Sequence, residues 1–173
     1  MPAPDPTAPL KDNGKPNYDR VDPKIEKRYR DSYMKAKDST MPQLRAEHHQ
    51  YAGTEASSIG EDFRQRGRYK EAIAWHLQDA WHHEQCFHTA GRADKPHKWR
   101  QAGVEGEVDA WGEVARCCGE QADGCEDAGE RAEWHRSKCG FCLRALQAAE
   151  RPGAEAAGLV KRQQARRLPS PAC

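Results

Sequence analysis

The sequence has few large apolar side chains: Leu, Ile, Val and Phe together number 18 of its 173 residues. It also lacks any apolar run near the ~18 residues that a membrane-spanning helix needs. The opening residues, Met-Pro-Ala-Pro-Asp, show neither the basic region nor the apolar run of a signal peptide. A net charge of only +1 gives no strong whole-molecule attraction to nucleic acid. We therefore expect a cytoplasmic protein with a thin core and no membrane segment.

The cysteines do not form a regular pattern. There are 7 of them, an odd number at uneven spacings. This usage argues against a disulfide framework and favours reduced thiols. Alanine, by contrast, is abundant, and small side chains allow helix axes to approach closely. The composition therefore favours tightly paired helices.

Proline is nearly absent from the middle of the chain, where only Pro96 lies between Pro42 and Pro152. Because proline interrupts helices, its absence marks the region of long helices. We predict a disordered arm over 1–21, a short basic helix over 22–40, a helical-hairpin domain over 42–151 and a disordered basic tail over 152–173.

Apolar and small residues recur at alternating spacings of three and four, which is typical of helices. The pattern predicts helices over 42–66, 69–92, 98–121 and 126–150, and Asp22-Pro23 predicts the start of the shorter one. In the first of these, the residues expected to face inward are Leu44, His48, Ala52, Ile59 and Phe63. In the last, they are Ala128, Ala132, His135, Cys139, Cys142, Leu146 and Ala149. No alternation typical of strands is present, so the predicted class is all-α, built of antiparallel helical hairpins.

Residues 56–81, ASSIGEDFRQRGRYKEAIAWHLQDAW, resemble one tetratricopeptide repeat. Ile59-Gly60 corresponds to the family's Leu-Gly step, Gly67 to its turn and Ala72 to the start of its second helix, whereas His76 lies where an aromatic is usual. The resemblance covers about residues 53–86, and a degenerate second copy covers 108–148. It implies that two helices cross closely at Gly60 and Ala72. The alternative is a four- or five-helix bundle without true repeats.

In that family, the first helix of each repeat lines a groove that receives a partner segment. The resemblance implies these partner-binding positions: Thr54, Ser57, Glu61, Arg64, Gln65, Asp109, Arg116 and Glu120. We therefore expect an adaptor that binds another protein through a helix-lined groove, without a cofactor. Arg64 and Arg116 favour acidic groups on the partner, because a guanidinium binds carboxylates with two parallel hydrogen bonds. Since such arrays usually need ~3 repeats, the N-terminal helix serves as a cap, or the chain forms a homo-oligomer.

A different class of function is suggested by histidine and cysteine. His82 and Cys86 lie four residues apart on one helical face, a spacing that suits two ligands of a metal ion. His135, Cys139 and Cys142 form a second half-site. The alternative to an adaptor is therefore a helical bundle that binds zinc or copper. No nucleophile elbow, phosphate-binding glycine loop or metalloprotease motif is present, so we do not expect an enzyme.

Overall fold

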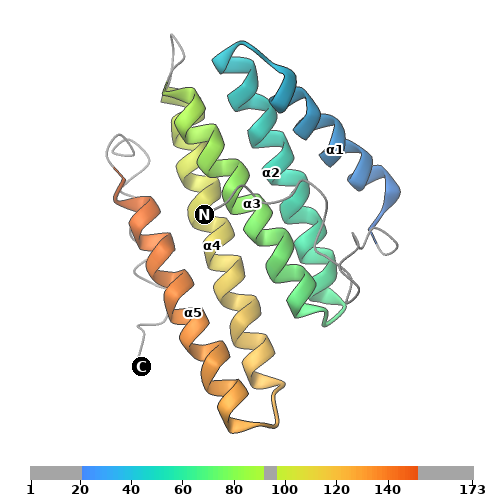
Figure 1. The fold of residues 1–173 in the computed structure, drawn as a ribbon, viewed down its shortest axis with the longest axis vertical. Coiled ribbons are helices and arrows are strands. Elements are labelled where there is room, and N and C mark those ends of the chain that lie inside the picture. Colours follow the sequence, from blue (N-terminus) through green and yellow to red (C-terminus); the bar gives the residue numbers. More distant parts are fainter. Residues whose placement is uncertain (1–20, 92–96, 152–173) are drawn as a thin grey trace.

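The computed structural model describes residues 21–91 and 97–151. The helices, in chain order, are α1 (Pro23–Asp38), α2 (Pro42–Gln65), α3 (Tyr69–Ala90), α4 (His97–Asp123) and α5 (Ala128–Ala149) (Figure 1). The predicted all-α class is confirmed, and each predicted helix agrees with an observed one to within two residues at either end. The predicted tail over 152–173 and, apart from Val21, the predicted arm over 1–21 lie outside the described residues.

Local signals account for the helix ends. Asp22 Oδ1 accepts a hydrogen bond from the backbone N–H of Lys24 at 2.8 Å, and a proline follows it in the first turn of α1. Asp127 likewise accepts from the N–H of Glu130 at 2.7 Å at the start of α5. Gly67, between α2 and α3, has φ of 71°, a conformation that glycine adopts without steric cost.

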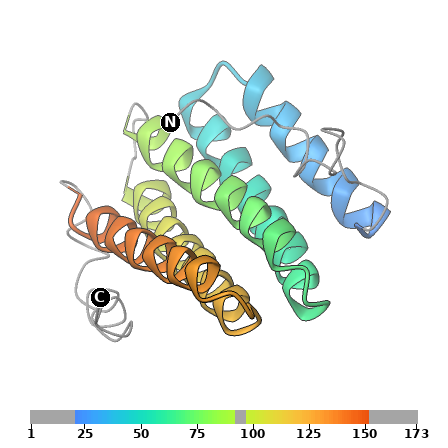
Figure 2. The same ribbon diagram turned by 60° about the horizontal axis from the view of Figure 1, so that its bottom comes forward.

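Each helix packs against the next in antiparallel fashion, and α2 also contacts α4. As a result, α2 and α4 lie in one layer and α3 and α5 in the other (Figure 2). Because α3 packs against both α2 and α4, one of its faces lies at the seam between these two helices. This seam carries the candidate site described below.

The core is divided into clusters on the two sides of α3. On the side of α1 and α2, Tyr29, Phe63 and Trp75 are almost completely buried. On the side of α4 and α5, the buried residues include Val104 and Trp111. Much of the remaining core is alanine and cysteine, as the composition indicated. All six cysteines in the described residues are free thiols.

The predicted inward face of α2 is wrong in its first half. Leu44 is 40% exposed and His48 is half-buried, whereas Ala46 and His49 are buried instead. Ala46 and His49 pack against residues of α3, and Gly53 lies one turn further on, where an added Cβ would overlap the ring of His83.

The predicted inward face of α5 is also wrong in its first half. Ala128, Ala132 and His135 are exposed, Cys139 and Leu146 are half-buried, and only Cys142 and Ala149 of the predicted face are buried. Among the described helices, α5 packs against α4 alone. Its first turns have no second helix to cover them, because the α4–α5 turn extends beyond the α2–α3 turn (Figure 1).

None of the described helices combines the length and the apolar character that crossing a bilayer requires.

Candidate functional site

Two histidines of α3, seven residues apart, occupy the seam between α2 and α4. His83 lies between Gly53 of α2 and Gly106 of α4, and a Cβ atom at either glycine would overlap its ring. His76 lies against Gly60, where an added Cβ would be only 2.8 Å from its Cε1 and Nε2. The close approach predicted at Gly60 is thus present, but its neighbour is His76, one turn beyond Ala72.

Above His83, α2 and α4 form the walls of an open cavity of about 290 Å³ whose floor is α3. Its lining residues are Gln50, Thr54, Ser57, Asp79, His83, Ala102, Glu105, Gly106 and Asp109. Three of these carry a carboxyl group and none is a lysine or an arginine. The cavity therefore suits a cationic or hydrogen-bond-donating group.

The floor of this cavity is held by a buried pair. His83 Nε2 lies 2.9 Å from Asp79 Oδ1, and His83 Nδ1 lies 3.0 Å from Gln50 Oε1. Burial raises the pKa of Asp79, and its contact with His83 opposes that rise. The pair fixes the orientation of the imidazole between the two glycines.

Two turns along the seam, charged side chains of α2 and α4 face one another. Arg64 lies 2.7 Å from Glu61 and 3.0 Å from Glu120, so it joins the two helices. Arg116 pairs with Glu113 on α4 itself. Hydrogen bonding by Arg64 lowers the pKa of Glu61 to about 2, so this carboxylate is ionised at neutral pH.

His76 lies between these carboxylates. A ring nitrogen of His76 and one oxygen each from Glu61 and Glu113 all lie within 4.8 Å of one another. His76 is 1% exposed, and neither ring nitrogen has a hydrogen-bond partner among the described residues. Burial lowers the pKa of His76 to about 4, which keeps the imidazole neutral at pH 7. An imidazole and two carboxylates are donors that could hold a metal ion.

The structure brings most of the expected groove positions to this seam. Thr54, Ser57 and Asp109 line the cavity. The others belong to the charged group: Glu61, Arg64, Gln65, Arg116 and Glu120. Gln65, at the end of α2, is exposed and donates to Glu61 at 3.0 Å. Arg116 is exposed, although its guanidinium is paired with Glu113.

Sequence reasoning did not assign five of the residues along the seam to a site. These are Gln50, Asp79, His83, Glu105 and Glu113. One signal could have found some of them: Gly53 and Gly60 on one helix, and His76 and His83 on the next, share a seven-residue spacing. In an antiparallel pair, these spacings place each histidine opposite a glycine.

The histidine and cysteine residues that suggested a metal site lie elsewhere. His82 is fully buried, and its Nδ1 lies 3.1 Å from His49 Nδ1 while its Nε2 lies 3.3 Å from the Tyr29 hydroxyl. Cys86 donates to the Trp99 carbonyl at 3.3 Å, and burial raises its pKa to about 12, which disfavours the thiolate that a metal requires.

The second half-site is dispersed along α5. His135 is exposed, Cys139 half-buried and Cys142 buried. In the described ranges, the one group of three or more potential ligands that comes together is Glu61, His76 and Glu113.

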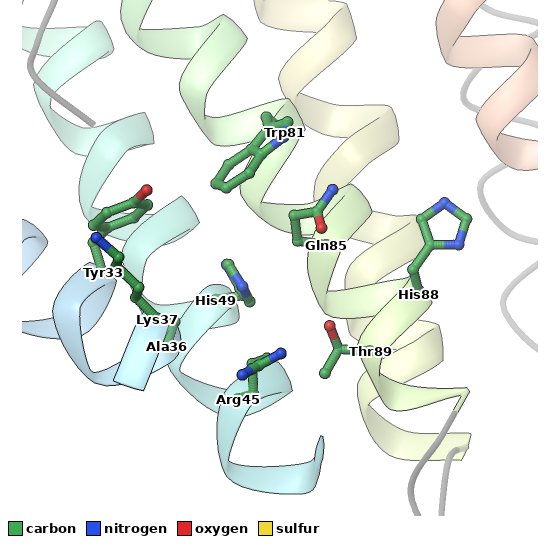
Figure 3. Close-up of a pocket in the computed structure, with 9 residues that line it drawn as sticks. All are labelled: Tyr33, Ala36, Lys37, Arg45, His49, Trp81, Gln85, His88 and Thr89. Carbon is green, nitrogen blue, oxygen red and sulfur yellow. The ribbon is translucent and has the colours of Figure 1, made fainter. Parts of the chain in front are cut away.

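A second cavity, of about 310 Å³, lies on the other side of α3, between α1 and α2 (Figure 3). Its lining is Tyr33, Ala36, Lys37, Arg45, His49, Trp81, Gln85, His88 and Thr89. None of these is acidic, but the guanidinium of Arg45 already donates to the Ser39 carbonyl at 3.0 and 2.7 Å. This cavity is opposite in charge to the one between α2 and α4.

No family model, curated protein or solved structure matches this chain. The class that can be stated is therefore that of the fold: five helices packed sequentially as antiparallel hairpins.

Proposed function

We propose that this protein is a binding module whose α2–α4 groove receives an extended segment of a partner protein, in the manner of a tetratricopeptide array. In this proposal α2 and α4 act as the groove-lining helices, and α3 and α5 as the outer helices. The two-layer arrangement supports it, as does the position of the groove residues on the facing sides of α2 and α4. The action is binding, with no catalytic step.

The observation that carries the proposal is the acidic, open cavity above His83. Glu105 and Asp109 stand at its wall and Asp79 at its floor. A lysine or arginine side chain of a partner would place its charge beside these carboxylates, of which Asp109 is exposed and Glu105 half-buried. We therefore propose that the bound segment is basic.

The earlier expectation of an acidic partner depended on Arg64 and Arg116. Arg64 is held by Glu61 and Glu120, and Arg116 by Glu113. An acidic segment would have to displace these carboxylates, whereas the cavity lining contains three carboxyl groups and no lysine or arginine.

The test uses two pools of fluorescent peptides, matched in length and hydrophobicity, one carrying Lys and Arg and the other Asp and Glu. We expect the basic pool to raise the fluorescence anisotropy on binding, and added salt to weaken the binding. Asp109→Lys should reduce affinity at least about tenfold, which corresponds to ~1.4 kcal/mol.

The matched control is Glu133→Lys, the same charge change at an exposed position of α5. It should bind the basic pool like the wild type. Equal binding of both pools, or equal loss in both variants, would contradict the groove assignment.

A further inference from the structure

Three buried polar atoms without partners meet where α2, α3 and α4 come together. They are both ring nitrogens of His76 and Oε2 of Glu113. Buried polar atoms without hydrogen bonds are rare in folded proteins, since each costs about 1–3 kcal/mol. Glu61 contributes a third side chain whose carboxylate lies within 4.8 Å of the other two ligand atoms. Their convergence calls for a ligand that accepts electron pairs from all three side chains.

The donor atoms suit a cation and not an anion, because carboxylate oxygens and an unprotonated ring nitrogen each offer a lone pair. An imidazole nitrogen with two carboxylate oxygens is a donor set for first-row transition metals, with zinc bonds of about 2.0–2.2 Å.

The surrounding arginines leave room for such an ion. Arg116 pairs with Oε1 of Glu113 and leaves its buried Oε2 without a partner. Arg64 donates to both oxygens of Glu61 at 2.7 Å and to Glu120 at 3.0 Å, so an ion would share the Glu61 carboxylate with this guanidinium. With Glu120 included, three carboxylates face two guanidinium groups, so a net negative charge remains to attract a cation.

We propose that Glu61, His76 and Glu113 form a binding site for a divalent transition-metal ion of the zinc type. One ligand comes from each of α2, α3 and α4, so the bound ion links the two layers of the fold. Three protein ligands also leave at least one coordination position for water or for a group of a partner. The site does not depend on the groove proposal, because none of its ligands lines the cavity above His83.

The test is titration of the full-length, chelator-treated, reduced protein with Zn²⁺, followed by calorimetry and by thermal denaturation. We expect one tight zinc per chain and a melting temperature that rises with zinc concentration, because the ion binds only the folded state. Glu113→Gln should weaken zinc binding at least about tenfold, since even residues that merely support metal ligands contribute that much.

His76→Phe provides a variant that keeps the fold. It retains an aromatic ring beside Gly60, larger than imidazole by one ring atom, and removes both unpartnered nitrogens. The zinc-dependent rise in melting temperature should disappear, while the metal-free variant melts close to the temperature of the metal-free wild type.

Two controls separate this site from the thiols. Glu105→Gln makes the same change on the same helix and should leave zinc affinity unaltered. Cys139→Ser with Cys142→Ser should also leave it unaltered, and bound Co²⁺ should show no thiolate charge-transfer band. The proposal is overturned if the wild type takes up no zinc, or if uptake persists unchanged in His76→Phe and Glu113→Gln.

Discussion

Two histidines of α3, six residues apart, have opposite surroundings. His82 faces α1 and α2, where His49 and Tyr29 contact its two ring nitrogens at 3.1 and 3.3 Å. His76 faces the seam between α2 and α4, and its two nitrogens have no hydrogen-bond partner in the described parts of the chain. Both rings are almost completely buried.

The difference shows that burial alone does not reveal what a histidine does. Burial lowers the pKa of both, so both are neutral at pH 7. The hydrogen bonds of His82 are satisfied by the protein, which is the condition of a structural residue. The carboxylates of Glu61 and Glu113 lie near His76, but neither of its ring nitrogens has a hydrogen-bond partner among the described residues.

The largest effect on stability is expected at His82, whose two ring nitrogens both have partners. His82→Ala removes a buried ring and leaves His49 and Tyr29 each without one partner. Cavity formation and the stranded polar groups together should cost about 3–5 kcal/mol of unfolding free energy. Chemical denaturation measures this loss, and a cost below that of His76→Phe would reverse the comparison of the two histidines.

Acid should also destabilise the packing of α3 against α1 and α2, where His49 and His82 lie. Burial lowers the pKa of His49 to about 4 and that of His82 well below 6.5, whereas both return to about 6.5 when unfolded. The unfolded state then binds more protons, so this stability is complete above pH 6.5 and is lost as the pH falls. We expect His49 to account for a loss of about 2 kcal/mol by pH 5, and His82 to add to it.

Urea denaturation at pH 7.5 and pH 5 measures that loss. His49→Phe should reduce the difference, and His135→Gln, at an exposed site on α5, should leave it as in the wild type. A stability that stays constant across this range would show that the His49–His82 pair is open to water.

The packing of α3 at the seam between α2 and α4 can be tested by substituting glycines there. Gly106→Ala places a methyl group into the ring of His83, which Asp79 and Gln50 hold in position. This overpacking should cost about 2 kcal/mol. Gly112→Ala, on the same helix, meets nothing within 4 Å and should instead stabilise the helix by up to ~1 kcal/mol. Equal effects on melting temperature would contradict the close packing of α3 against α4.

The smallest effect is expected at His76 in the absence of metal. His76→Phe removes two unpartnered nitrogens, and the additional ring atom beside Gly60 offsets this gain, so stability should change by less than about 1 kcal/mol. Its comparison with His82→Ala therefore gives the sharpest contrast between the two sides. A loss as large as that of His82→Ala would mean that His76 has a structural partner.

The helices could be predicted because their signals are local. Asp22-Pro23, Gly67 and the proline-poor middle each act through the backbone of neighbouring residues, and the observed helix ends lie close to the predicted ones. The same spacing of four and three in 98–121 includes Val104, Val108 and Trp111, and all three are buried. Valine and tryptophan are large enough to mark a buried face by themselves.

The faces of α2 and α5 could not be predicted in the same way. Alanine, glycine, histidine and cysteine provide little contrast in hydrophobicity, so Leu44 and His48 were placed inside while Ala46 and His49 are the buried pair. On α5, the spacing of three and four continues through turns that are exposed. This spacing reflects the helical period of α5 and does not indicate which turns another helix covers.

By itself, the sequence determined the fold class and the helix boundaries, because these depend on backbone signals and on a periodicity within each helix. Only the tertiary structure decided which histidines lack partners and which carboxylates reach them. Glu61, His76 and Glu113 are separated by 15 and 37 residues of chain, and their distances depend on how closely α3 lies between α2 and α4. That approach is set by glycines on two helices meeting rings on a third, a condition that no single helix carries in its own sequence.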